Sequence, residues 1–395
     1  MNEHLVRIKK LAIAVLSIIL MTYGCASLVM SQVMFQTFYR RGSPELQSKL
    51  NMTKKAFISL LICILNFVSP SSIRISTDNA TLAKGTFRKS NGKIISQMKR
   101  RSIIIANHQI YTDWVFLWWL TSTADLAGSI YIMLKKSLES IPLLGYGMRN
   151  FKFIFLSRKW AQDKIILHNS LGVIDANSRG VGPLSGARPI RVDDDGEMYW
   201  DVNKTDDSKA WPYCLLLFPE GTNLSATTRR KSASFAEKVG RQPFSHVLLP
   251  HSTGLRSSLI LLRASVEVVY DITIGYSGVG RSDYGEMMYR LPNIFLRGQT
   301  PKLVDMHIRA FNLAEIPVDD EEAFSQWLYE VWKEKDDLME KYYTDGTFAS
   351  DPELNQIVVG GFNISPKPVL VTCLLPAVLV FSLLLVGYLA YAWLT

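Results

Sequence analysis

The chain has 395 residues, 48% of them apolar and 11% aromatic, and its formal net charge at pH 7 is +9. This length provides for one sizeable domain together with membrane anchors. The basic charge suits anionic lipids or nucleic acid, and nucleic acid is not expected as a partner because the sequence contains no nucleic-acid-binding motif.

Apolar stretches near the N-terminus predict membrane-associated helices within residues 1–70. Residues 11–38 are long enough to span a bilayer, and basic residues on both sides leave the orientation open. This stretch is too long for a signal peptide and has no clear small-residue cleavage pattern, so it is expected to be retained. Residues 56–68 are short for a full span, which indicates a re-entrant or interfacial helix, or a helix buried in a soluble domain.

Residues 71–345 predict an α/β domain in which a mixed sheet is flanked by helices. Strand-like runs lie near residues 102–106, 130–134, 152–156, 213–218, 268–274 and 303–310. Helical patterns lie near residues 113–122, 160–177, 230–239, 252–263 and 324–338. The tryptophans of the first of these helices suit either a membrane interface or ordinary core packing.

Two further segments are predicted from composition and charge. Residues 187–210 form an acidic insertion without periodicity, which we expect to be a mobile loop. Residues 346–368 are expected to be a linker, and residues 369–395 a transmembrane anchor. Lys367 precedes this apolar run and no basic residue follows it, so the positive-inside rule places the α/β domain in the cytosol.

A histidine and a carboxylate, His108 and Asp113, follow the first predicted strand of the domain. Five positions along an ideal helix rotate by about 500°, so the two side chains would lie roughly 140° apart and could not touch. We therefore expect a turn between them, with Asp113 near the N-terminus of the next helix. Asp113 could then accept from one imidazole nitrogen while the other faces a substrate. The alternative is a hydrogen-bonded histidine–carboxylate pair on the surface or in the core, with no catalytic role.

A second polar segment, residues 218–223, follows the apolar strand that starts at residue 213. Glu220 and Gly221 would therefore emerge at the carboxyl end of a strand, where α/β folds place their ligands. Gly221 lets the backbone approach a ligand, and Glu220 can accept from a hydroxyl. A polar turn that only ends the strand is the alternative.

Together these segments resemble the glycerolipid acyltransferase family, which includes 1-acylglycerol-3-phosphate and lysophospholipid acyltransferases. The resemblance covers roughly residues 95–275 and consists of four sequence blocks, at residues 107–113, 136–158, 218–222 and 248–251. The details of the first, third and fourth blocks look most like the fungal and animal branch that remodels lysophospholipids, including lysophosphatidylinositol.

The resemblance implies acyl-CoA-dependent transfer, with acyl-CoA as a co-substrate and no bound cofactor. His108 would take the proton from a free hydroxyl of the lysophospholipid acceptor, whose oxygen attacks the thioester carbonyl. Asp113 would orient the imidazole and stabilise the imidazolium, and no acyl-enzyme is needed.

The same resemblance assigns substrate contacts to the other blocks. Arg158 would pair with the acceptor phosphate, the alternative being a solvated surface charge. Glu220, Gly221 and Thr222 would bind the glycerol or headgroup side. Pro250 would help to position the acyl chain or thioester, although a structural proline that closes a strand explains it equally well.

A basic run follows the third block and is formed by Arg229, Arg230 and Lys231. A phosphorylated partner such as coenzyme A or the lipid headgroup would find positive charge there. A solvated basic turn is the alternative. His251 has no obvious carboxylate partner in the sequence, so we do not assign it a role.

Other chemistries lack their sequence signatures. Residues 275–280 come nearest to the serine-hydrolase elbow but have valine where the last glycine belongs. Neither a phosphate-binding P-loop nor a His-Glu-x-x-His motif is present. The cysteines at positions 25, 63, 214 and 373 form no close pair, which argues against a metal site and a disulfide framework.

The sequence therefore predicts a membrane acyltransferase that acts on a lysophospholipid, with lysophosphatidylinositol as a candidate acceptor. The rival reaction is acylation of 1-acylglycerol 3-phosphate to phosphatidic acid, and the rival of another class is a catalytically silent, lipid-binding scaffold. The resemblance and the membrane spans point to the endoplasmic reticulum membrane, with lipid droplets and mitochondrial membranes as open alternatives.

Overall fold

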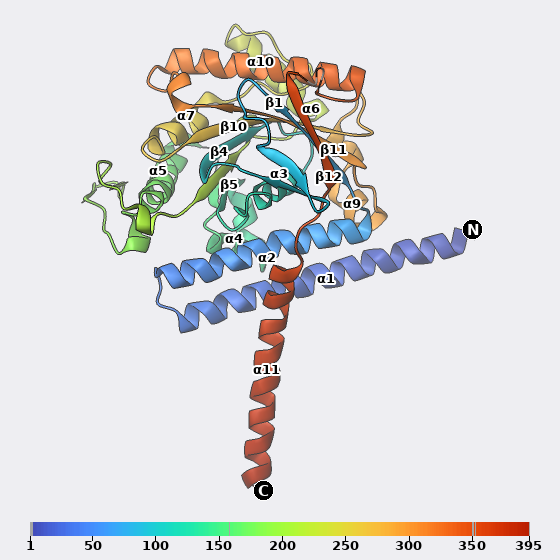
Figure 1. Ribbon diagram of the computed structural model, residues 1–395, viewed down its shortest axis with the longest axis vertical. Helices are drawn as coiled ribbons and strands as arrows, with labels where there is room; N and C mark the ends of the chain where they lie inside the picture. The colour runs from blue at the N-terminus through green and yellow to red at the C-terminus, as the bar shows by residue number, and fades with distance from the viewer. Residues whose placement is uncertain (1–2, 158, 350, 352, 395) are drawn as a thin grey trace.

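The computed structural model describes residues 3–157, 159–349, 351 and 353–394, and an eight-stranded mixed sheet forms its centre (Figure 1). The strands in their order across the sheet are β12 (Asn355–Gly361), β1 (Ser72–Asp78), β11 (Leu303–Phe311), β10 (Val268–Tyr276), β4 (Arg101–Ala106), β9 (Tyr213–Leu217), β5 (Ile130–Lys135) and β6 (Ile154–Leu156). β10, β4, β9, β5 and β6 run parallel, whereas β11 is antiparallel to β10. The α/β class with a mixed sheet flanked by helices is thereby confirmed.

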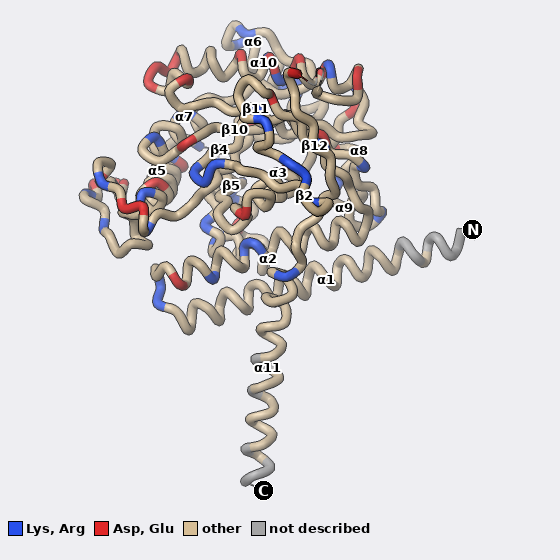
Figure 2. Tube along the Cα trace, in the orientation of Figure 1, with Lys and Arg blue, Asp and Glu red and all other residues tan. Residues whose placement is uncertain are grey.

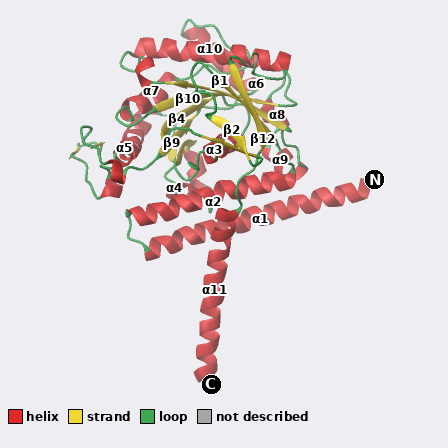
Figure 3. Cartoon of the chain, in the orientation of Figure 1, coloured by secondary structure: helices red, strands yellow, loops and turns green. Residues whose placement is uncertain are grey.

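Helices cover both faces of this sheet, because the central strands are apolar on both sides. In β4, Ile104 and Ala106 face the core under α2 (Pro44–Val68) and α3 (Asp113–Ser122). Ile103 and Ile105 face the opposite core, under α5 (Trp160–Ser178), α7 (Ser252–Leu261) and α10 (Glu321–Asp345). Figure 3 shows these helices around the strands.

Shorter elements connect this frame. The remaining helices of the domain are α4 (Leu144–Asn150), α6 (Ala226–Lys238), α8 (Gly285–Met288) and α9 (Leu291–Arg297), with 3-10 turns at Lys136–Ser140, Pro183–Ser185, Asp207–Lys209 and Leu313–Glu315. Two small hairpins are formed by β2 (Phe87–Ser90) with β3 (Lys93–Ser96) and by β7 (Arg191–Val192) with β8 (Met198–Tyr199).

The long N-terminal helix α1 (Glu3–Phe38) packs side by side with α2 beneath the domain. α11 (Lys367–Leu394) crosses these two helices and extends away from the domain (Figure 1). Leu11–Phe38 and Pro44–Val68 are each long and apolar enough to cross a membrane. α1 exposes large apolar side chains such as Ile18 and Ile19, whereas α2 is mostly buried. Charged residues lie mostly in the domain and are almost absent from α11 (Figure 2). The role of α11 as an anchor stays a prediction.

The helix expected at residues 56–68 is longer than its apolar run, and begins at Pro44 after the capping residue Ser43. Lysines in the first half of the helix lower the local hydropathy, so the hydropathy pattern does not reveal its buried face. Lys54 is fully buried, and its amine donates to the carbonyl oxygen of Ile130 at 2.7 Å. This hydrogen bond gives the buried amine a partner, which allows a polar side chain to lie in the core.

The linker expected at residues 346–368 was wrong for residues 355–361, which form the edge strand β12 and pair antiparallel with β1. The α/β domain therefore extends beyond residue 345.

The acidic insertion at residues 187–210 contains the β7–β8 hairpin, and Asn169 of α5 accepts from the amide of Met198 at 2.7 Å. The insertion therefore contains a short hairpin that is held against α5, and its expected mobility stays a prediction.

Core packing accounts for two of the three tryptophans of α3. Trp118 and Trp119 are buried, and their indole nitrogens donate to the carbonyl oxygens of Ala127 and Asn363 at 2.8 and 2.9 Å. The membrane-interface alternative is therefore wrong for these two residues.

A buried ion network joins α10 to the sheet. Lys335 is fully buried, and its amine donates to Asp271 at 2.7 Å and to the carbonyl oxygen of Ile272 at 2.9 Å. Arg309 donates to the other oxygen of Asp271 at 2.8 Å. Burial by itself would raise the pKa of Asp271, but the charges of Lys335 and Arg309 hold it below its ordinary value.

Replacement of Lys335 by methionine should destabilise the protein by about 3–5 kcal/mol, because Asp271 would stay buried without one of its two cationic partners. The midpoint of thermal unfolding of the full chain in detergent measures this. Lys333→Met changes an exposed lysine of the same helix and should shift the midpoint little. Equal shifts in the two variants would contradict the assigned role of the network.

Candidate active site

The two polar segments singled out in the sequence lie next to each other in space. β4 and β9 are parallel neighbours, and Ile105 pairs with Leu217 in their register. The carboxyl ends of parallel strands meet at one edge of the sheet. The segment that contains His108 therefore leaves the sheet beside the segment that contains Glu220.

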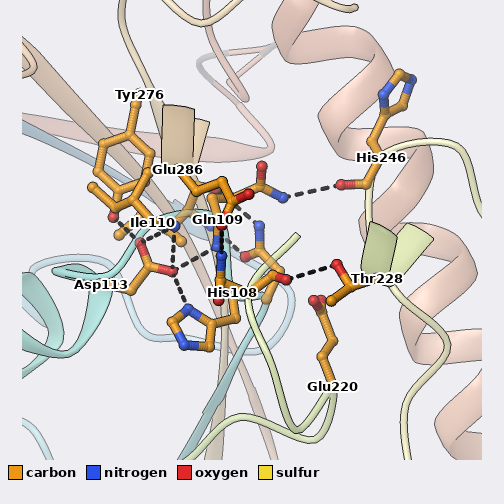
Figure 4. Close-up of polar contacts among 12 residues, drawn as sticks. His108, Gln109, Ile110, Asp113, Glu220, Thr228, His246, Tyr276 and Glu286 are labelled. Atoms are coloured by element: carbon orange, nitrogen blue, oxygen red, sulfur yellow. Dashed lines mark hydrogen bonds and ion pairs between the residues drawn. The ribbon is translucent and has the colours of Figure 1, made fainter. Parts of the chain in front are cut away.

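The turn predicted between His108 and Asp113 is present and brings the two side chains into contact. Nδ1 of His108 lies 2.8 Å from Oδ2 of Asp113 (Figure 4). The same oxygen accepts from the backbone amides of Gln109 and Ile110 at 2.6 and 3.1 Å. Asp113 is fully buried as the first residue of α3, where the helix dipole favours a negative charge.

A second strand completes the surroundings of Asp113. Tyr276, at the end of β10, donates its hydroxyl to Oδ1 of Asp113. Because every one of these groups donates to the carboxylate, its orientation is fixed, and it in turn fixes the imidazole. Burial, followed by the charge of Asp113, raises the pKa of Tyr276, so its hydroxyl keeps its proton and stays a donor.

The imidazole of His108 is held on its flat side as well. It stacks on Phe218 with 4.4 Å between the ring centroids. Its backbone carbonyl accepts from the amide of Leu224 at 2.8 Å. The side chain keeps 19% of its surface exposed. Since Nδ1 is engaged by Asp113, Nε2 is the nitrogen that would face a substrate, as the sequence predicts.

The turn after β9 depends on a glycine. Gly221 has φ +70°, a backbone conformation that residues with a Cβ rarely adopt. The carbonyl oxygen of Pro219 accepts from the amide of His251 at 2.9 Å. The predicted residues Gly221 and Pro250 are thereby brought together. Thr222 is half-buried in the same turn.

A hollow of about 180 Å³ includes Pro250 and His251 in its wall. α6 rests against it, because Ser232 accepts from the amide of Leu249 at 2.8 Å. The basic residues predicted to meet phosphate are exposed on this helix: Arg229, Arg230 and Lys231. Arg158 lies outside the described residues.

Glu220 occupies a different environment from the one expected of a residue that binds a lipid hydroxyl. It is only 3% exposed, and its Oε1 accepts from the indole of Trp332 on α10 at 3.2 Å. Burial raises the pKa of Glu220 to about 8, against the lowering effect of the Trp332 indole and the backbone amide of His108. The hydrogen bond between Glu220 and Trp332 attaches the turn to α10. A contact of Glu220 with substrate stays a prediction.

Sequence reasoning missed several residues that shape this site. Tyr276 lies 163 positions from its partner Asp113. Asn107 belongs to the first sequence block, and its side chain bonds both the amide and the carbonyl of Ile274 on β10, at 2.8 and 3.0 Å. No local pattern could have indicated these partners. Among the described residues, three or more potential metal-ligating side chains do not gather anywhere.

Comparison with known proteins gives one consistent result. Residues 87–277 match the profile of the Acyltransferase family, and residues 294–370 match that of the acyltransferase C-terminus. Over 380 residues the chain is 51% identical to 2-acyl-1-lysophosphatidylinositol acyltransferase of Saccharomyces cerevisiae, which covers 95% of this chain and 96% of that protein.

More distant relatives carry other names. The chain is 31% identical over 282 residues to probable 1-acyl-sn-glycerol-3-phosphate acyltransferase 5 of Arabidopsis thaliana, covering 71% of this chain and 62% of that protein. It is 30% identical over 248 residues to lysocardiolipin acyltransferase 1 of Gallus gallus, covering 62% and 55%.

The raised pKa of Glu220 predicts a distinct dependence of stability on pH. The ordinary pKa is 4.5 and the folded value is about 8, so between these values the folded protein holds a proton that the unfolded chain has released. The contribution of Glu220 to stability therefore falls as the pH rises through this window, by up to about 1.4 kcal/mol per pH unit.

Glu220→Gln removes this titration, so its stability relative to the unmodified protein should grow from about pH 5 to about pH 8. Thermal midpoints at several pH values measure the difference. Glu237→Gln, at an exposed position of α6, should follow the unmodified protein throughout. Parallel curves for Glu220→Gln and the unmodified protein would show that Glu220 is ionised in the fold.

Proposed function

The chain belongs to the acyltransferase family, and from this premise we propose that it transfers a fatty acyl chain from acyl-CoA to a free hydroxyl of a lysophospholipid, with lysophosphatidylinositol as the acceptor. The observation that carries the proposal is the contact between His108 and Asp113 beside the turn that contains Gly221. The 51% identity to the yeast lysophosphatidylinositol enzyme over nearly the whole chain supports the choice of acceptor.

The proposed reaction uses the geometry as follows. Nε2 of His108 takes the proton of the acceptor hydroxyl as its oxygen attacks the thioester carbonyl. The carbon–sulfur bond then breaks, and the imidazolium returns the proton to the departing coenzyme A thiolate. Asp113 stabilises the imidazolium in between. The ester and free coenzyme A are the products, and neither an acyl-enzyme nor a metal is required.

Positive charge supports acyl-CoA as the donor. Arg229, Arg230 and Lys231 are exposed on α6, which borders the hollow beside Pro250. The phosphates of coenzyme A would meet this charge while the thioester reaches toward His108.

The apolar helices α1 and α2 support a membrane setting in which the acceptor arrives from the lipid. We place the enzyme in the endoplasmic reticulum membrane with its catalytic domain in the cytosol. Lys367 before the apolar run of α11 fits this orientation.

A second candidate acceptor is 1-acylglycerol 3-phosphate, since the Arabidopsis relative carries that name. A catalytically silent scaffold is disfavoured, because lipid binding alone does not need a buried carboxylate bonded to a partly exposed imidazole.

His108→Ala and Asp113→Asn should each lower kcat about a hundredfold or more, because one removes the base and the other its orientation. Purified protein in detergent, a panel of lysophospholipids and release of free thiol from acyl-CoA provide the assay. His168→Ala, on α5 beside Tyr199, is the matched control and should keep its activity. Unchanged turnover in both site variants would remove the dyad. If the unmodified protein released no thiol with any acceptor of the panel, the scaffold would be favoured.

Tyr276→Phe should lower kcat about tenfold with little change in KM, because it removes one hydrogen bond to the Asp113 carboxylate while the buried ring is kept. Tyr276 acts here as a positioning residue. Tyr289→Phe removes a hydroxyl that donates to the carbonyl oxygen of Ser277 instead, and serves as the control. A larger effect of Tyr289→Phe on kcat would argue against a special role of the Tyr276 hydroxyl.

A further inference from the structure

A second hollow, of about 300 Å³, lies beside the His108 turn. Its wall is formed by Tyr111, Glu286, Arg290, Leu291 and Pro292. Tyr111 and Arg290 are exposed at this hollow, and Glu286 is half-buried. Glu286 and Arg290 belong to none of the four sequence blocks that carry the family resemblance.

α8 fixes this hollow close to the catalytic turn. A Cβ at Gly285 would lie 2.8 Å from Cγ2 of Ile110, so the backbone of α8 rests directly on the turn. Glu286 is the next residue and lies over the turn (Figure 4). Asn223, from the turn after β9, donates its side-chain amide to Oε2 of Glu286. The hollow is thus joined to both segments of the active site.

The polar groups of the hollow suit a polyol attached to a phosphodiester. The carboxylate of Glu286 accepts from hydroxyl groups, and the guanidinium of Arg290 fits phosphate oxygens. Burial and the charge of Glu286 raise the pKa of Tyr111, so its phenol remains a proton donor. A terminal phosphomonoester offers few donors and more negative charge, and Glu286 would repel it.

The position of the hollow also fits a lipid headgroup. Met287, Leu291 and Leu296 of the α8–α9 segment are exposed apolar residues. α9 packs against α1 and α2, and Gly298 at its end approaches the carbonyl oxygen of Val68. An apolar rim beside apolar helices, with a polar hollow above it, matches the boundary between acyl chains and headgroups.

We propose that this hollow binds the headgroup of the acceptor as a phosphodiester-linked polyol, and that Glu286 selects it against a phosphomonoester. The inference rests on the proposed function and names a site within it. With the headgroup held there, the glycerol hydroxyl lies toward His108, three residues before Tyr111.

The test compares two acceptors over the same series of acyl-CoA concentrations, with the full chain in detergent. The unmodified protein, Glu286→Gln and Tyr111→Phe are assayed by thiol release with lysophosphatidylinositol and with 1-acylglycerol 3-phosphate. In both variants, kcat/KM for lysophosphatidylinositol divided by kcat/KM for 1-acylglycerol 3-phosphate should fall. Glu286→Gln should lower this ratio by about tenfold, because it loses a charge-assisted hydrogen bond to the polyol and the repulsion of the phosphomonoester together. Arg290→Gln should raise KM for both acceptors, since both carry phosphate.

Asp283→Asn removes an exposed carboxylate three residues before Glu286 and outside the hollow, so it should leave the ratio unchanged. An active Glu286→Gln or Tyr111→Phe variant whose two kcat/KM values change by one common factor would overturn the headgroup site, because support of the turn affects both acceptors alike. An unmodified protein inactive with both acceptors would overturn the proposed function and the headgroup site with it.

Discussion

The hydrogen bonds to the buried carboxylate of Asp113 are the interaction on which the site depends. They gather the amides of the turn after β4, the imidazole of His108 and the hydroxyl of Tyr276 from β10 around two oxygen atoms. A charge that is removed from water needs such partners, so the turn is constrained to close in one way. The position of the His108 imidazole is therefore set by the hydrogen bonds that the Asp113 carboxylate accepts.

The opposite side of the site is held by α10. Its Trp332 bonds Glu220 at the turn after β9, and its Lys335 bonds Asp271 of β10. The two strands that flank β4 are thus tied to one helix. Glu220 is best kept neutral in this setting, whereas Asp271, with two cationic partners, is best kept ionised. Burial therefore favours the neutral form of one buried carboxyl group, whereas two cationic neighbours favour the ionised form of the other.

The turn that contains His108 is also connected to the two apolar N-terminal helices. α8 rests on Ile110, and the following helix α9 packs against α1 and α2. A lipid that leaves the bilayer along these helices would meet the polar groups around Glu286 before its glycerol reaches His108. Recognition of the headgroup and orientation of the reacting hydroxyl would then be parts of one binding event, which is how binding energy is used to position a reaction.

Local signals in the sequence were sufficient for elements whose burial shows in their own residues. The apolar runs of β4 and β9 predicted two strands, and the spacing of His108 and Asp113 predicted the turn, because each depends on neighbours along the chain. Tertiary structure decided the rest. β12 forms at residues 355–361 because β1 offers it an unpaired edge, and Lys54 lies buried in α2 because the carbonyl oxygen of Ile130 accepts from its amine. The partners of Asp113 and Glu220 on β10 and α10 likewise could not be read in advance, since periodicity records which side of an element is buried and not what it is buried against.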